Sequence, residues 1–151
     1  MAMRSYRPKD SAGVKKLILS ILKKEYPFDQ AAYRDTDIND ISGTYGGARN
    51  AFFVIEDGGE IVGTVGIKRD SPSVALLRRL FVGEPKRRKG YGTALLKKAV
   101  SFCREKKYKE MVFRATDRMM PAIRLCKKHG FEKVESLEVG GFHIHIFVKS
   151  L

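Results

Sequence analysis

The segment from Leu80 to Leu96 constrains the fold of this chain more than any other part of the sequence. A strand-like run ends at Leu80-Phe81-Val82, a basic loop containing two glycines follows, and a helical pattern begins at Gly92. Glycine lets the backbone turn tightly and approach a ligand closely. The unpaired N–H groups and the dipole at a helix start favour bound phosphate. The segment therefore predicts a strand–loop–helix unit with an anion site at its turn.

The remaining apolar residues alternate between strand and helix patterns. We expect strands at 3–7, 51–56, 61–67, 74–82, 111–115, 131–137 and 142–148, and helices near 10–26, 92–107 and 121–130. Glycine turns at 57–60 and 139–141 join neighbouring strands as hairpins. Helices placed between strands favour an α/β domain with a mixed sheet. Because 151 residues is the length of one typical domain, we expect a single domain over residues 1–151.

Apolar runs and cysteines exclude several classes of protein. Lys15 and Lys16 interrupt the stretch from Val14 to Leu22, so no run is long enough to cross a membrane. The first residues lack the apolar core of a signal peptide. Cys103 and Cys126 are the only cysteines, too few for a disulfide framework, an all-cysteine zinc site or an iron–sulfur cluster. We therefore expect a cytoplasmic protein with no membrane partner.

Positive charge is concentrated between Lys86 and Val134. This stretch holds sixteen lysines and arginines against four acidic residues, whereas the whole chain has 30 against 17 and a formal net charge of +13. Such a surface suits a polyanionic partner, either nucleic acid or a phosphorylated cofactor. An ordinary soluble basic surface would have the same composition. Charge alone therefore leaves both interpretations open.

Two motifs identify a family resemblance. The loop lacks the Gly-Lys-Ser/Thr of a Walker loop, and Leu95 stands where a dinucleotide fingerprint needs its third glycine. It does spell Arg-x-x-Gly-x-Gly, as Arg87-Arg88-Lys89-Gly90-Tyr91-Gly92, which resembles the acyl-CoA pyrophosphate loop of the GNAT acyltransferases. Downstream, the segment from Ala122 to Phe131 resembles that family's Ala-x-x-Leu-Tyr-x-x-x-Gly-Phe motif, and Ile61-Val62-Gly63 resembles its second hairpin.

This resemblance implies a GNAT fold, a mixed central sheet of about six or seven strands flanked by about four helices. It also implies that acetyl-CoA is the cosubstrate. The backbone of Leu80, Phe81 and Val82 would line the pantetheine, and N–H groups from Arg88 to Thr93 would hold the pyrophosphate. The implied cofactor site comprises Leu80, Phe81, Val82, Arg87, Arg88, Lys89, Gly90, Tyr91, Gly92, Thr93, Ala122 and Cys126.

Three positions depart from the family pattern. Cys126 replaces the tyrosine that often protonates the leaving thiolate, Leu76 stands where many members carry a glutamate base, and Met119 replaces a frequent asparagine. Cys126 is interpreted either as a buried small hydrophobe, as a weak proton donor or as an acylated nucleophile. Positioning the amine beside the thioester can by itself lower the activation barrier by about 7–11 kcal/mol. A backbone N–H near Phe81 or Val82 could polarise the thioester carbonyl. We expect direct transfer in a ternary complex.

Other residues are candidates for a base or for acceptor recognition. Glu56 ends a strand, and His143 and His145 share one face of the last strand. Each is also explained as an ordinary surface or hydrogen-bonded residue, and two histidines without a third partner make a poor zinc site, so no metal is expected. The acidic cluster is either a surface for a cationic amine, or else a solvated loop or helix cap; it comprises Asp29, Asp35, Asp37 and Asp40.

The sequence thus predicts an N-acetyltransferase acting on a small-molecule or peptide amine, as a monomer or a homodimer. The alternative is a catalytically weak GNAT-like binding module that holds nucleic acid or CoA on its basic surface. Nucleic acid is the less favoured partner, because the basic stretch lacks interleaved aromatic residues and a recognisable helix-turn-helix or RRM signature. The two hypotheses differ in salt dependence, since phosphate contacts to a duplex weaken steeply with salt.

Overall fold

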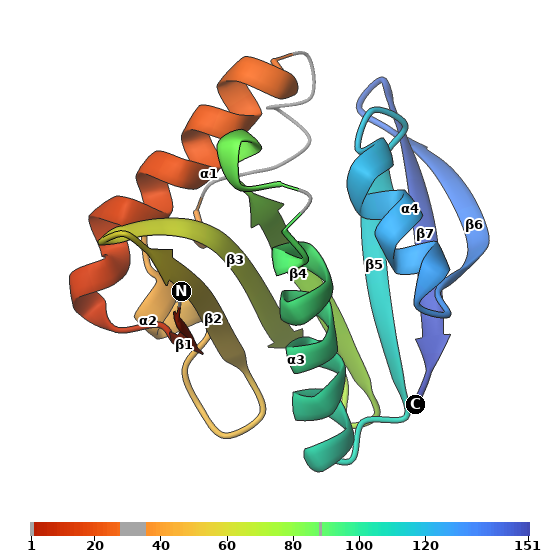
Figure 1. The fold of residues 1–151 in the computed structure, drawn as a ribbon. Helices are drawn as coiled ribbons and strands as arrows, with labels where there is room; N and C mark the ends of the chain where they lie inside the picture. Colours follow the sequence, from red (N-terminus) through yellow and green to blue (C-terminus); the bar gives the residue numbers. More distant parts are fainter. Residues whose placement is uncertain (1, 28–35, 88) are drawn as a thin grey trace.

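A twisted seven-stranded mixed sheet forms the centre of the computed structural model, which describes residues 2–27, 36–87 and 89–151 (Figure 1). The strands lie in the order β1-β2-β3-β4-β5-β7-β6. Their bounds are Ala2–Ser5 (β1), Ala51–Asp57 (β2), Glu60–Arg69 (β3), Val74–Val82 (β4), Glu110–Thr116 (β5), Glu132–Val139 (β6) and Phe142–Ser150 (β7). Only β4 and β5 pair in parallel, and every other neighbouring pair is antiparallel.

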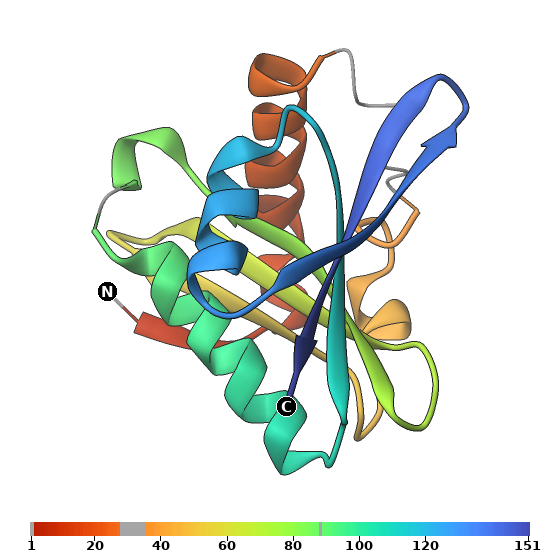
Figure 2. The same ribbon diagram turned by 90° about the vertical axis from the view of Figure 1, so that its right-hand side faces the viewer.

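Within the described ranges four α-helices flank this sheet, with α3 and α4 on one face and α1 and α2 on the other (Figures 1 and 2). They are Ser11–Glu25 (α1), Ile41–Thr44 (α2), Tyr91–Glu105 (α3) and Met120–Lys128 (α4), and single 3₁₀ turns occupy Pro8–Asp10 (η1) and Glu84–Lys86 (η3). In the described ranges no helix is long and apolar enough to cross a membrane.

The predicted fold and element order are confirmed, with small differences at the ends. The first strand is Ala2–Ser5 rather than 3–7, because Pro8 begins η1. The helix expected at 92–107 begins at Tyr91 and ends at Glu105. Both predicted hairpin turns form, and the four glycines in them have positive φ angles, which L side chains rarely adopt.

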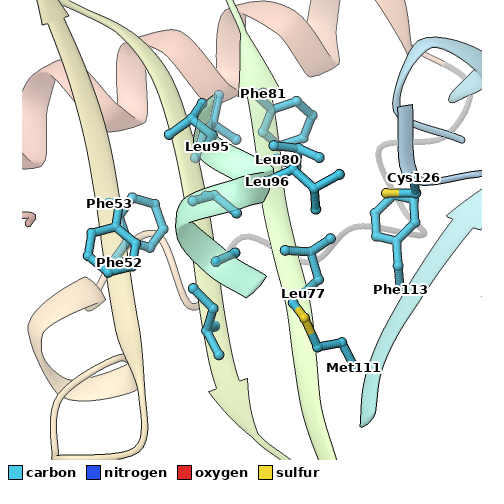
Figure 3. Close-up of a cluster of buried hydrophobic side chains, with 14 of the residues drawn as sticks. Phe52, Phe53, Leu77, Leu80, Phe81, Leu95, Leu96, Met111, Phe113 and Cys126 are labelled. Atoms are coloured by element: carbon cyan, nitrogen blue, oxygen red, sulfur yellow. The ribbon is translucent and has the colours of Figure 1, made fainter. Parts of the chain in front are cut away.

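Helix packing follows the apolar spacing of each helix. On α3 the buried residues recur every three or four positions and face β3 and β4. Figure 3 shows Leu95 and Leu96 of this helix among Leu77, Leu80 and Phe81 of β4. Gly63 of β3 leaves room for the Leu95 side chain, because a Cβ at position 63 would lie 3.0 Å from a Leu95 methyl carbon. Helix α3 is thereby packed against β3 and β4.

Candidate functional site

The sheet opens where β4 and β5 part. They pair only from Val74 with Glu110 to Leu77 with Phe113, and beyond this point the two ribbons diverge (Figure 1). The register between β3 and β4 shifts near the same place, and Arg79 has a φ angle of 54°. Such a bulge bends a strand and re-aims its peptide groups. The end of β4, Leu80 to Val82, therefore has no strand partner on the β5 side.

A buried ion pair holds the bulge of β4. The Arg79 Nη2 atom lies 2.6 Å from Asp37 Oδ1, and its Nε atom donates to Asp37 Oδ2 at 3.0 Å. The Tyr45 hydroxyl also donates to Asp37, at 2.7 Å. Only 5% of the Arg79 side chain and 4% of the Asp37 side chain are exposed. Residues 36–40, which precede α2, are thus fastened to β4.

The pKa of Asp37 reflects this environment. Burial alone would raise the pKa of its carboxyl group, but the hydrogen bonds from Arg79 and Tyr45 outweigh burial and hold the pKa below its ordinary value. Asp37 is consequently a carboxylate at neutral pH. Its charge is needed to compensate the Arg79 guanidinium inside the protein.

Gly66 of β3 makes room for this network, and its replacement should be destabilising. A Cβ at Gly66 would lie 2.8 Å from Cε1 of the Tyr45 ring and 3.1 Å from Phe52. Both rings are buried, so Gly66→Ala should lower the free energy of unfolding by about 1–3 kcal/mol through overpacking.

Equilibrium urea unfolding would measure the effect, with Gly63→Ala as the matched control. At Gly63 the nearest atom is the end of the flexible Leu95 side chain, so that variant should lose less. A Gly66→Ala protein as stable as its parent would contradict the tight packing around Tyr45.

Helix α3 begins, like any α-helix, with backbone donors that have no partner within the helix. Gly90 is its N-cap with a φ angle of 80°, no side chain caps the helix, and its first turn contains no acidic residue. The first intrahelical bond runs from the Ala94 N–H to the Gly90 carbonyl at 3.0 Å. The preceding N–H groups of the helix lack such partners. This arrangement fits a pyrophosphate group, which would accept those hydrogen bonds next to the positive end of the helix dipole.

Neighbouring charges fix the loop that leads into α3. The Tyr91 hydroxyl donates to Asp57 at 2.8 Å, and Lys86 lies 3.4 Å from the same carboxylate. The Tyr91 hydrogen bond is the main cause of the lowered pKa of Asp57. Arg87 forms a two-pronged pair with Glu25, at 2.7 Å on each arm, and its Nε donates to the Val82 carbonyl at 3.0 Å. The guanidinium of Arg87 therefore anchors the loop to α1 and β4.

The predicted cofactor residues gather around the end of β4 and the start of α3. Leu80, Phe81 and Tyr91 have buried side chains, while Lys89 and Gly90 are exposed and Arg88 lies outside the described residues. Gly92 sits between β4 and α4, since a Cβ there would lie 3.1 Å from Leu125 and 3.9 Å from Val82. Ala122 on α4 is half-buried. The binding role of each residue stays a prediction.

Cys126 lies inside the core between α4 and β5. Its side chain is fully buried, and Figure 3 shows its sulfur beside the Phe113 ring. Burial raises the pKa of the Cys126 thiol to about 12. The thiol therefore stays protonated at neutral pH, which disfavours it as a nucleophile because the thiolate is the reactive form.

The other catalytic candidates occupy different surroundings. Glu56, 38% exposed, lies 3.3 Å from Arg4, which itself pairs with Asp10. His143 lies near the tip of the last hairpin, where its Nε2 is 2.9 Å from Glu138 and both side chains are more than half exposed. The structure does not bring Glu56 and His143 together, and the catalytic role of each stays a prediction.

His145, on the same strand, has a hydrogen-bond partner at each ring nitrogen. Its Nδ1 is 2.8 Å from the Ser136 hydroxyl, and its Nε2 contacts the Asp117 carboxylate. That contact is the main cause of the lowered pKa of Asp117. His145 is 16% exposed and pairs with Ala115 near the end of β5, where the sheet opens. The imidazole ring is therefore held by Ser136 on β6 and by Asp117, which directly follows β5.

Of the acidic cluster, the structure describes Asp37 and Asp40, and both have structural partners. Asp37 is buried against Arg79, and Asp40 caps α2 by accepting from the Gly43 N–H at 3.1 Å. Asp29 and Asp35 lie outside the described residues. The prediction of a solvated loop is wrong for Asp37. Sequence patterns carried no signal for its pairing, because its partner lies 42 positions away.

Comparisons with known proteins find a matching family and several relatives. A model of a family described as "Acetyltransferase (GNAT) family" matches residues 16–131. A mouse protein, "Probable N-acetyltransferase family 8 member 5", is 32% identical over 78% of this chain and 55% of its own length. A rat protein, "N-acetyltransferase 8", is 36% identical over 65% of this chain and 47% of its own length. The chain thus spans about half the length of these relatives.

Solved structures share the fold. An acetyltransferase from Streptococcus agalactiae superposes with a TM-score of 0.84 at 22% identity, covering 99% of this chain and 98% of the other. A GNAT family acetyltransferase from Elizabethkingia anophelis, solved with acetyl-CoA bound, gives a TM-score of 0.69 at 16% identity, covering 99% and 97%.

Proposed function

Because this chain belongs to the GNAT acetyltransferase family, we propose that it moves an acetyl group from acetyl-CoA to a primary amine by direct attack in a ternary complex. The observation that carries the proposal is the junction of β4 and α3. A bulged strand whose end does not pair with β5 leads through a glycine loop into a helix start without a side-chain cap. This junction offers contacts to two parts of one ligand, a thioester arm and a pyrophosphate.

The chain's backbone supplies most of the proposed binding. N–H groups at the start of α3 would hold the pyrophosphate, and Lys89 adds an exposed positive charge nearby. The open edge of β4 from Leu80 to Val82 would pair with the amide groups of the pantetheine arm. A peptide N–H near Phe81 or Val82 would donate to the thioester oxygen as negative charge develops there. Acetyl-CoA supplies the activated acyl group and a thiol leaving group.

Proton removal from the acceptor amine needs a base, and we assign this role to His145. Its Nε2 faces Asp117 and its Nδ1 faces the Ser136 hydroxyl, so the amine proton would reach Nδ1 through that hydroxyl, which passes on its own proton and takes up that of the amine. Position 145 lies at the end of the sheet where β4 and β5 separate. Glu56 is tied to Arg4, and His143 is exposed beside Glu138.

Release of the thiol of CoA from acetyl-CoA, followed colorimetrically with a panel of primary amines, tests the function. Amine-dependent release with stoichiometric N-acetylated product, identified by mass spectrometry, is the expected result. Absence of release with small amines, amino acids and peptide N-termini, while acetyl-CoA binds, would remove the catalytic part of the proposal and favour the binding module.

Replacing Cys126 separates direct transfer from an acyl-enzyme route. Cys126→Ala should keep kcat within about threefold of the parent, because a buried, protonated thiol performs no covalent step. The small cavity should cost on the order of 1 kcal/mol in stability. Cys103→Ala is the matched control, since Cys103 is equally buried and its thiol pKa is likewise raised to about 12. A rate loss confined to Cys126→Ala would argue for a covalent acyl-enzyme.

A further inference from the structure

A basic hollow lies between α3 and the C-terminal end of α4, away from the glycine loop. Its volume is about 440 Å³, and its polar lining consists of Lys97, Ser101, Arg104, His129 and Lys149. The buried side chains of Leu96 and Val100 contribute its apolar lining. A hollow of this size falls within the range of small-molecule sites.

The cations of this hollow are uncompensated. No acidic residue is part of its lining. In the described part of the chain, Lys97, Arg104 and Lys149 take part in none of the ion pairs. Lys97, Ser101 and Arg104 recur at positions i, i+4 and i+7 of α3, so they share one face of the helix. Three positive charges thus converge with a hydroxyl on one concave surface.

His129 adds an unsatisfied donor or acceptor to the same place. It is the C-cap of α4, and its Nε2 atom is buried without a hydrogen-bond partner among the described residues. A buried polar atom without a partner is costly. Burial first, and then repulsion from Lys97, Lys128 and Lys149, lowers the pKa of His129. A neutral ring with its N–H on Nε2 would donate to an oxygen anion in the hollow.

The lack of a side chain at Gly130 leaves space for the Lys149 ammonium group in the hollow. A Cβ on Gly130 would lie 2.8 Å from the Lys149 ammonium, so any side chain would displace it. Gly130 also has a φ angle of 93°, which favours glycine. The turn that ends α4 therefore brings Lys149 of β7 beside His129.

We propose that this hollow is a second anion site, which binds the phosphate monoester of a small organic molecule. Lys97, Arg104 and Lys149 would neutralise the dianion, Ser101 and His129 would donate to its oxygens, and Leu96 and Val100 would contact the organic body. Arg104 lies twelve residues beyond Gly92, about 18 Å along the helix axis. A pyrophosphate at the start of α3 therefore cannot occupy the Arg104 end. The proposal does not depend on acetyl transfer.

Two sources could supply this phosphate, the 3′-phosphate of CoA or a separate metabolite. The probes are inorganic phosphate, adenosine 3′,5′-bisphosphate, CoA and dephospho-CoA, titrated calorimetrically at constant ionic strength. The test variant is Arg104→Gln/Lys149→Gln. The control, Lys98→Gln/Lys127→Gln, removes the same charge from exposed positions outside the lining. Circular dichroism of both variants verifies that each is folded.

We expect phosphate and the bisphosphate to bind the parent and the control, and to bind the test variant about tenfold to a hundredfold more weakly. If CoA loses its advantage over dephospho-CoA only in the test variant, CoA is the source. If phosphate still binds beside saturating CoA, the source is a separate molecule. Equal weakening in both variants, or duplex DNA binding without any phosphate binding, would overturn the proposal.

Discussion

Asp37→Asn is expected to lower the free energy of unfolding by about 3–5 kcal/mol, among the largest effects of any single substitution in this chain. The amide can still accept from Tyr45, but it no longer supplies the negative charge that pairs with the buried Arg79 guanidinium. Urea unfolding at pH 7 measures the loss. Asp40→Asn is the control, because Asp40 is exposed and only caps α2.

A double variant identifies the cause of that loss. Arg79→Met in the Asp37→Asn background removes the buried charge, so it should recover much of the lost stability. Recovery would show that loss of the charge pairing with Arg79, rather than disturbed packing around residue 37, is responsible. An Asp37→Asn protein within about 1 kcal/mol of the parent would contradict the buried pair.

The same pair predicts how stability depends on pH. The pKa of Asp37 is lower in the folded chain than its ordinary value of 3.8, so its stabilisation is fully present above that value. Between the ordinary pKa and the lowered folded pKa, the unfolded chain binds the proton more readily than the folded chain does. The stabilisation is therefore lost as the pH falls through the folded pKa. The difference in stability between the parent and Asp37→Asn should therefore begin to shrink below about pH 4 and disappear below the folded pKa of Asp37.

His145→Gln is expected to lower kcat by about 10²- to 10⁴-fold, with little change in the affinity for acetyl-CoA. Glutamine keeps a hydrogen-bonding side chain between Asp117 and Ser136 but cannot take a proton from the amine. Steady-state kinetics with the best amine, together with calorimetric binding of acetyl-CoA, measures both quantities.

His143→Gln is the matched control for this prediction. It lies on the same strand and face, but its ring is exposed and paired with Glu138 near the hairpin tip. Its kcat should stay close to that of the parent. Equal rates in all three proteins would exclude His145 as the base, and a rate loss only in His143→Gln would transfer the role to His143.

Local patterns in the sequence were sufficient to predict much of the fold. The spacing of apolar residues located the sheet strands and long helices, and the glycine loop located the start of α3. These features depend on residues close together in the chain, such as Gly90 and Gly92. The family motifs then predicted which strand would precede the loop.

Local sequence patterns could not predict the side-chain contacts that depend on how distant strands and segments pack together. Asp37 and Arg79 are charged residues, which are rarely buried, and only the β4 bulge and the packing of the segment before α2 bring them together. Alternation predicted that His143 and His145 share a face. It could not distinguish them, because Asp117 and Ser136 reach His145 through the β5–β7–β6 pairing. Arg87 was predicted for the cofactor, and its bond to Glu25 depends on where α1 packs.

Thermal unfolding with acetyl-CoA, at low and high salt, tests the central claim that the junction of β4 and α3 is a CoA site. Duplex DNA and RNA are run in parallel. Gly92→Glu places a carboxylate at the helix start and against Leu125, and Ser20→Glu adds the same charge on the exposed side of α1. We predict about 2.7 kcal/mol of stabilisation of the parent and of Ser20→Glu at a hundred times the Kd, at both salt concentrations, and none in Gly92→Glu. No shift with acetyl-CoA, but a salt-sensitive shift with nucleic acid, would contradict the account.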